Sequence, residues 1–441
     1  MPEIEPFRGI LYDTAKVEAS KVLAPPYDVI DDAGRAALES MDPHNCVRLI
    51  LPQGEGDAKY GAANQTLNAW LADGALIRDT RPAIYRYHQV FTVDALGGRS
   101  FTRRGFVAAV RLHSFDEGVI LPHERTLAGP KVDRLKLMEA TSAHFSQIFT
   151  LYSDPSKATD DLFRKVESTT PDVDGVTDDG TRHRVWRVPD RELIGKLQRL
   201  MGQMKLYIAD GHHRYETMLA LRESFRKRVG GELSFRSSAK YGTLFCANMD
   251  DAGLVVLPTH RLVHDLASFD FAAVREKASR WFEITEIPGA AGDATRLATE
   301  IHDRSEVSPT FAAIVPGSDS AWLMTLRGSA NLAAEGLSGS RALLDLDITL
   351  LHALVLERVL GIDRKAQEAK TNIHYIRDTP SALQRTAAGE GQVCFILEPT
   401  RLKQIRAVAD AHEFMPQKST YFYPKIASGV VFNRIDPNED L

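Results

Sequence analysis

The stretch Lys205-Leu-Tyr-Ile-Ala-Asp-Gly-His-His-Arg-Tyr-Glu-Thr-Met-Leu-Ala-Leu221 predicts a strand, a tight turn and a helix in direct succession. The apolar run from Leu206 to Ala209 is typical of a buried strand, and apolar residues recur at helical spacing from Tyr215 onward. Gly211 suits the turn, because glycine adopts backbone conformations that other residues avoid. Since the first N–H groups of a helix lack partners within it, the turn predicts an anion site.

The residues of this turn carry suitable chemistry for a phosphate. The imidazoles of His212 and His213 and the guanidinium of Arg214 are donors to anionic oxygens. The carboxylate of Asp210 could hold a metal ion or orient a histidine. The alternative is a surface turn whose polar residues only cap the helix; the strand-turn-helix context favours the binding site.

Length and charge bound the class of protein. A chain of 441 residues predicts two or three domains, and 44% hydrophobic with 26% charged residues is a globular composition. The 54 basic and 59 acidic residues give a net charge of −5, which argues against a surface devoted to nucleic acid. Nucleic acid is therefore not an expected partner.

The cysteines and the apolar segments indicate a cytoplasmic protein. Cys46, Cys246 and Cys394 lie far apart in or beside apolar runs, which favours buried reduced thiols over disulfides or a zinc site. No stretch approaches the ~20 apolar residues of a membrane span, and the N-terminal residues lack the pattern of a signal peptide. We expect no membrane partner.

A second polar stretch runs from Leu121 to Arg134 and contains Pro122-His123-Glu124. Its prolines and Gly129 prevent one regular element, and polar side chains on a rigid loop often build sites. Glu124 can take a proton from an attacking hydroxyl, and Lys131 or Arg134 can neutralise a phosphate. The alternative is a solvated loop that runs into a helix from Lys131.

Two further segments carry candidate side chains. Lys418, Ser419 and Thr420 offer one cation and two hydroxyls at a turn, which suits phosphate oxygens, although the glycine spacing of a P-loop is missing. Tyr27 and Asp28 follow two prolines on a rigid extended path and could reach a cleft. Equally, those prolines could lock an edge while Asp28 caps a helix.

Regular elements are predicted along the chain from periodicity. Residues 45–51 are expected to form a strand and residues 58–72 an amphipathic helix. Residues 83–93 and 100–112 flank a Gly-Gly turn and predict a β-hairpin. Residues 343–360 predict one strongly apolar helix.

Three of these stretches together resemble a known family. The order Pro122-His123-Glu124, Asp210-Gly-His-His-Arg214 and Pro416-Gln-Lys-Ser-Thr420 is similar to the motif order of free serine kinases of the ParB/sulfiredoxin-like superfamily. Over nearly its full length the chain also resembles the bacterial domain-of-unknown-function family numbered ten-fifteen, through Ala24-Pro-Pro-Tyr-Asp-Val-Ile30 and the tail Lys418-Ser-Thr-Tyr-Phe-Tyr-Pro-Lys425.

The resemblance implies roles at the matching positions. Glu124, after His123, corresponds to the base that acts on the serine hydroxyl. Asp210 to Arg214 correspond to the turn that binds nucleotide phosphates and metal. Lys418, Ser419 and Thr420 correspond to the segment that holds the phosphate or the amino acid. The longer spacing between Glu124 and Asp210 looks like an insertion.

We therefore expect a small-molecule phosphotransferase that acts on a hydroxyl amino acid, in either direction, with ATP or ADP and Mg²⁺. The alternative is a ParB-like nucleotide-binding regulatory protein without turnover. The expected fold is α/β with mixed sheets: a ParB/sulfiredoxin-like catalytic region over residues 1–240, an α+β subdomain over 241–340, and a C-terminal segment over 341–441 that completes the phosphate site. A homodimer is left open.

Overall fold

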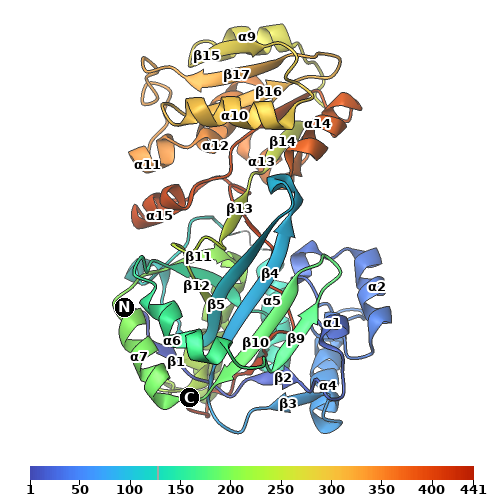
Figure 1. Cartoon of the computed structure of the whole chain (residues 1–441), viewed down its shortest axis with the longest axis vertical. Coiled ribbons are helices and arrows are strands. Elements are labelled where there is room, and N and C mark those ends of the chain that lie inside the picture. Colours follow the sequence, from blue (N-terminus) through green and yellow to red (C-terminus); the bar gives the residue numbers. More distant parts are fainter. Residues whose placement is uncertain (127–128) are drawn as a thin grey trace. The chain divides into compact units, whose positions relative to one another are not determined.

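The computed structural model describes residues 1–126 and 129–441 and divides the chain into two compact units (Figure 1). The first unit contains Met1–Pro122, Thr126–Leu254 and Pro424–Leu441, and the second contains His123–Arg125 and Val255–Tyr423. Both units combine helices with sheets, so the predicted α/β class with mixed sheets is confirmed.

A mixed sheet forms the centre of the first unit. Its order is β6 (Ile120–Leu121), β11 (Leu206–Asp210), β8 (Ile148–Tyr152), β12 (Tyr241–Asn248), β5 (Arg99–Arg111), β4 (Ile84–Val93), β10 (Arg182–Val188) and β9 (Val173–Val176), with β1 (Ile4–Glu5) beside β5. β11 runs parallel to β6 and β12 parallel to β8, while the other neighbours are antiparallel. The predicted hairpin is β4 and β5, and the predicted strand before the anion turn is β11.

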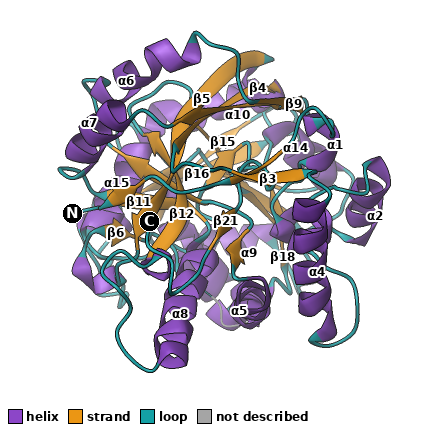
Figure 2. Cartoon of the chain, turned by 90° about the horizontal axis from the view of Figure 1, so that it is seen from below, coloured by secondary structure: helices purple, strands orange, loops and turns teal. Residues whose placement is uncertain are grey.

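Helices surround this sheet. They are α1 (Ala19–Val22), α2 (Asp32–Met41), α3 (Val47–Ile50), α4 (Ala58–Ala72), α5 (Gly129–Thr141), α6 (Ala158–Glu167), α7 (Arg191–Met201) and α8 (His212–Val229). α5 lies between α4 and α8, and α6 packs on α7 (Figure 2). Two small ribbons, β2 (Ile10–Tyr12) with β3 (Leu76–Arg78) and β7 (Ala143–His144) with β21 (Asn433–Arg434), complete the unit.

The packing of β11 against α8 explains why the sequence folds as predicted here. Leu206 and Ile208 of the strand are fully buried in one apolar cluster with Tyr215 and Met218 of the helix. Each such side chain contributes about 1.5–3 kcal/mol to stability on burial. The strand and helix on either side of the anion turn are therefore fixed by the core.

The first unit is closed by the segment Pro424–Leu441, which returns to it after the whole second unit. Phe432 pairs with Ile10, and the buried side-chain amide of Gln147 donates a hydrogen bond to the carbonyl oxygen of Val431. Phe432 is fully buried. This segment is thus part of the core of the first unit.

The second unit has an antiparallel sheet in the order β15 (Phe282–Ile287), β17 (Ala321–Leu326), β16 (Thr310–Ile314), β19 (Val393–Ile396), β14 (His260–Val263) and β18 (Ile373–Ile376), with a ribbon of β13 (Val255–Leu257) and β20 (Tyr421–Tyr423). Its α-helices are α9 (Phe271–Ala278), α10 (Ala294–Ser305), α11 (Arg341–Leu344), α12 (Asp347–Leu350), α13 (Arg364–Ala369), α14 (Thr379–Ala387) and α15 (Leu402–Asp410). The single helix predicted over residues 343–360 is interrupted between α11 and α12. From there α12 continues directly as a π-helix, Leu351–Val359.

Two local expectations differ from the structure. Residues 45–51 do not form a strand but contain the short helix α3, and Asn45 turns the chain into this helix by accepting a hydrogen bond from the Val47 N–H at 2.9 Å. The unit boundaries fall after Leu254 and Tyr423 rather than at residues 240 and 340, because β12 pairs with β5 and β8 of the first unit.

Two other expectations concern the state of the cysteines and the length of apolar helices. The three cysteines are free and buried, as expected. Among the residues with described positions, none of the helices is both long and apolar enough to span a bilayer.

Candidate functional site

The predicted anion turn is built by a bulge and a glycine. The register of β11 against β8 slips between Ile208 and Asp210, and such a β-bulge redirects the side chain that follows it. Gly211 then takes a φ of +95°, in the left-handed region where glycine has no steric penalty. α8 begins at His212, so both histidines and Arg214 lie in its first turn.

Asp210 is the centre of the polar contacts at this turn. One carboxylate oxygen accepts a hydrogen bond from Nη2 of Arg214 at 2.9 Å, and the other pairs with the ammonium of Lys425. Burial raises the pKa of such a carboxyl, but the charges of Lys425 and Arg214 outweigh it and hold the pKa of Asp210 well below its usual range. Two cations and one carboxylate leave one net positive charge at the N-terminus of an 18-residue helix.

The guanidinium of Arg214 is buried and held from two sides. Its Nη1 donates to the carbonyl oxygen of Gln147 at 2.7 Å while its Nη2 binds Asp210. A Cβ added at Gly211 would lie 3.0 Å from Nη2 of Arg214, which is too close. Gly211 therefore provides both the turn conformation and the space for Arg214.

Lys425 was not predicted as a site residue, and distant side chains fix its position. The side-chain amide of Gln89 donates to the Lys425 carbonyl oxygen at 3.0 Å, and the guanidinium of Arg103 donates to the carbonyl oxygen of Pro424. Arg103 is buried over the ring of Phe149, 4.7 Å from its centroid. Burial lowers the pKa of Arg103 to about 10, so it stays charged at neutral pH.

The remaining residues predicted for the first unit have different surroundings. Tyr27 is half-buried, and burial raises its pKa while the charges of Arg214 and Arg134 lower it, so it lies near the anion turn. Arg134 stacks on the Tyr27 ring at 4.2 Å and donates to Asp133 at 2.9 Å. These contacts give Arg134 a role in packing.

Lys131 and Asp28 lie at the edge of this group. The ammonium of Lys131 pairs with Glu216, which stands one turn after His212 on α8. Asp28 is exposed in the short 3₁₀-helix Tyr27–Val29. Of the two, the contacts place Lys131 beside α8.

The other predicted residues belong to the second unit. His123 is buried, and its Nε2 lies 3.0 Å from Oγ1 of Thr420. Glu124 forms a parallel β-bridge with Met415, whose N–H donates to the carbonyl oxygen of His123 at 2.8 Å. The Pro-His-Glu motif is thus paired with the loop that carries Lys418 to Thr420.

A buried arginine holds that loop. Nη2 of Arg261 donates to the carbonyl oxygen of Lys418 at 2.9 Å, and Nε donates to Nε2 of His352 at 3.2 Å. Burial lowers the pKa of Arg261 to about 10, and the nearby Tyr375, Asp347 and Glu124 oppose this effect. Sequence periodicity did not identify Arg261 as a site residue, because Arg261 lies inside a strand whose residues are all buried.

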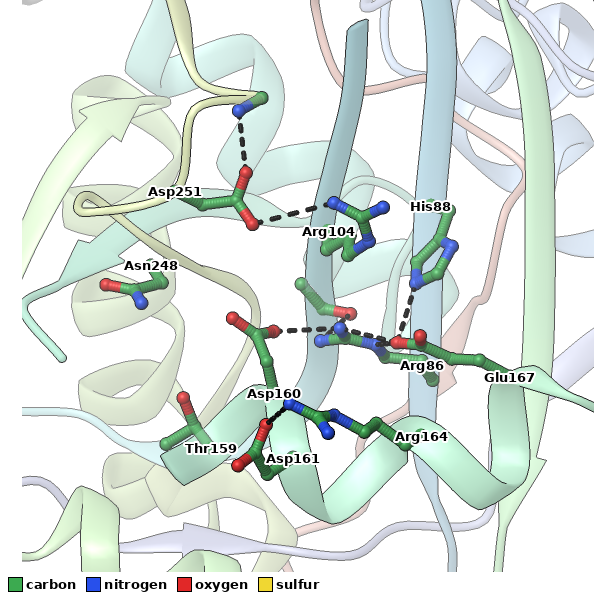
Figure 3. Close-up of polar contacts among 12 residues, drawn as sticks. Arg86, His88, Arg104, Thr159, Asp160, Asp161, Arg164, Glu167, Asn248 and Asp251 are labelled. Atoms are coloured by element: carbon green, nitrogen blue, oxygen red, sulfur yellow. Dashed lines mark hydrogen bonds and ion pairs between the residues drawn. The ribbon is translucent and has the colours of Figure 1, made fainter. Parts of the chain in front are cut away.

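A further polar cluster of the first unit is a structural feature (Figure 3). The fully buried guanidinium of Arg86 donates to Glu167 at 2.7 Å and to Asp160 at 2.8 Å, and it covers the ring of Phe163. His88 lies 3.0 Å from the same Glu167 oxygen. Because these contacts join β4 to α6, we assign the cluster to stability.

The structure does not fit a resident magnesium ion at Asp210. Both carboxylate oxygens already bind cationic groups, whereas Mg²⁺ requires carboxylate or phosphate oxygens around it. Within residues 1–126 and 129–441, no cluster of three or more histidine, cysteine or acidic side chains could hold a metal. No step below involves a protein-bound metal.

Comparisons with known proteins identify relatives of this arrangement. The model of the family described as "Protein of unknown function (DUF1015)" matches residues 4–349. No curated protein matches the sequence.

Solved structures resemble the chain only distantly. A mutant free serine kinase in complex with AMP is similar at 12% identity, with 74% of this chain and 91% of that chain covered and a TM-score of 0.36. A conserved hypothetical protein from Pyrococcus furiosus has 14% identity, coverage of 70% and 89%, and a TM-score of 0.33. SbnI with a C-terminal truncation, from Staphylococcus aureus, has 9% identity, coverage of 73% and 85%, and a TM-score of 0.33. No residue role follows from likenesses this distant.

Proposed function

The chain belongs to the DUF1015 family, and we propose that this member transfers a phosphoryl group to or from the hydroxyl of a small amino acid such as serine. The observation that carries the proposal is the turn in which Asp210 holds Arg214 and Lys425 at the N-terminus of α8. Phosphoryl transfer needs positioned cations and N–H donors around the phosphate more than covalent help from the protein.

In this proposal the first-unit turn binds the phosphates of a nucleotide. The N–H groups of the first turn of α8 and the guanidinium of Arg214 donate to phosphate oxygens, and Asp210 keeps the two cations in place. Gly211 lets the phosphate approach the backbone, because it carries no side chain of its own. His212, His213 and Lys131 line the same end of α8 as proposed phosphate-binding residues.

The second-unit group supplies the proposed acid-base chemistry and acceptor binding. Glu124 takes the proton of the attacking hydroxyl, and His123, fixed against Thr420, holds the motif in position. Lys418, Ser419 and Thr420 bind the acceptor. In the reverse direction the phosphoryl group passes from the serine oxygen to the nucleotide or to water, and Glu124 returns the proton to the serine oxygen.

The test is phosphoryl transfer by the purified chain, with and without Mg²⁺. ATP, ADP or pyrophosphate is supplied with L-serine, and O-phosphoserine is supplied for the reverse reaction. Glu124→Gln should lower kcat by about 10²–10⁴-fold, and Arg214→Gln should lower kcat/KM by roughly 10²-fold. Arg228→Gln, on the exposed last turn of α8, is the matched control.

Turnover that survives both site variants would refute the proposal. No turnover with any substrate pair, together with nucleotide binding that depends on Arg214, would favour the regulatory alternative instead.

A further inference from the structure

Three exposed cations of the second unit share one region. Lys370 follows the last residue of α13, Arg377 follows β18, and Lys418 lies in the loop before β20; all three are exposed. In the part of the chain whose positions are described, none of them forms an ion pair with a carboxylate. Exposed arginines and lysines are common on protein surfaces, but these three lie close to one another.

Arg261 brings the elements of this region together. Its guanidinium lies 5.2 Å from the centroid of the Tyr375 ring on β18 and donates to the carbonyl oxygen of Lys418 at 2.9 Å. The loop with Lys418 is therefore attached to β18. Lys370 stands just before this strand and Arg377 just after it. Burial lowers the pKa of Lys370, and the charges of Lys418 and Arg377 lower it further, in agreement with this arrangement.

The arginine of the group is held rigidly. Nη1 of Arg377 donates to the hydroxyl of Tyr421 at 3.0 Å, and its Cζ lies 4.1 Å from the centroid of the Tyr421 ring. A guanidinium stacked in this way loses less conformational entropy when it binds an anion. Arg377 is thus oriented before any ligand arrives.

The two lysines occupy backbone conformations that are costly for their type. Lys370 and Lys418 both have a φ of +58°, in the left-handed region. For residues other than glycine this conformation is unfavourable. Lys370 ends α13 at a position where glycine is the usual residue. Such strain is found at ligand sites, where a particular side chain is needed.

We propose that Lys370, Arg377 and Lys418 form an anion-binding site that takes the phosphate of a phosphorylated small molecule. Three positive groups that form no ion pair with a described carboxylate repel one another, and a dianionic phosphate relieves that repulsion. Its three terminal oxygens also match three separate donors. The inference rests on the proposed function only in that Lys418 is already proposed to bind the acceptor; Lys370 and Arg377 are new, and binding is measurable without turnover.

The test is calorimetric titration of the full chain with O-phospho-L-serine, inorganic phosphate and L-serine. Lys370→Gln and Arg377→Gln are compared with Lys365→Gln, an exposed lysine on α13 that makes no ion pair with a described residue. The set is repeated in an Arg214→Gln background, which weakens phosphate binding at the first-unit turn. Each of the two site variants should bind both phosphates about tenfold more weakly, and the control should bind as the wild type does.

Phosphate affinity equal to that of the Lys365 variant would overturn the inference, and so would the absence of phosphate binding by the wild type. If turnover fails but phosphate binding still depends on Lys370 and Arg377, only the proposed function falls. If turnover survives while binding ignores both residues, only this inference falls.

A second measurement on the wild-type chain does not depend on any variant. Acetic anhydride labels exposed lysines, and mass spectrometry reports the extent at each site. Inorganic phosphate should protect Lys370 and Lys418 from acetylation relative to Lys365. Equal labelling of the three lysines with and without phosphate would overturn the inference.

Discussion

Replacement of Gly211 by alanine should destabilise the first unit by two separable effects. Alanine at a φ of +95° costs roughly 1–2 kcal/mol in backbone strain. The new Cβ would also stand 3.0 Å from Nη2 of Arg214, so the guanidinium must move by a few tenths of an ångström, which weakens its hydrogen bonds to Asp210 and Gln147. Since full loss of a hydrogen bond to a charged group costs about 1.5–3 kcal/mol, Gly211→Ala should lower the free energy of unfolding by about 2–4 kcal/mol.

Gly230 provides a matched control at the other end of the same helix. Its φ is +70°, and a Cβ added there would meet no atom within 4 Å. Gly230→Ala therefore carries the backbone strain alone and should cost about 1–2 kcal/mol. The difference between the two variants isolates the contribution of the Arg214 contacts.

The assay follows each unit by its buried thiols. Brief alkylation at increasing urea concentrations, resolved by mass spectrometry, reports the unfolding midpoint at Cys46 and Cys246 of the first unit and at Cys394 of the second. Gly211→Ala should shift the first two midpoints further than Gly230→Ala does, while Cys394 serves as the internal reference. Equal shifts from the two variants would refute the claim that Arg214 is pressed against Gly211.

Two further predictions concern the first unit. Burial raises the pKa of Glu167, but hydrogen bonding to His88 and the charge of Arg86 lower it to about 2, whereas the pKa in the unfolded chain is 4.5. The free energy of unfolding should therefore fall by about 2 kcal/mol as the pH drops from 4.5 toward 2. Glu167→Gln should flatten this dependence, and parallel pH curves for variant and wild type in urea titrations would contradict it. A Cβ at Gly105 would lie 2.5 Å from the carbonyl oxygen of Cys246, so Gly105→Ala should cost at least about 3 kcal/mol by thermal unfolding; an unchanged Tm would show that β5 and β12 can separate.

The sequence was informative wherever local pattern and tertiary packing agree. β11, the turn at Gly211 and α8 followed from an apolar run, a glycine and helical spacing, and the core packs them in the same way. The strand predicted over residues 45–51 is wrong, because a short apolar run fits either a strand or a buried helical turn. The hydrogen bond that the Val47 N–H donates to the Asn45 side chain favours the helical turn.

The candidate site was predictable in its residue types but not in its grouping. The motif residues Asp210 and Arg214 do contact each other, as their spacing of four on adjoining elements allows. Lys425 could not be found, since Gln89 and Arg103 place it by contacts that span more than three hundred residues. Arg134 looked equally suited to bind a phosphate, but its guanidinium donates to Asp133 and stacks on the Tyr27 ring.

The return of Pro424–Leu441 to the first unit has a consequence for biosynthesis. A ribosome makes the chain from residue 1 onward, so Asp210 and Arg214 emerge more than two hundred residues before Lys425. In that interval residues Val255–Tyr423 of the second unit are synthesised, while Ile10 lacks its bridge partner Phe432. The second unit ends at Tyr423, so the turn at Asp210 acquires its second cation, Lys425, only after the last strand of the second unit has been made.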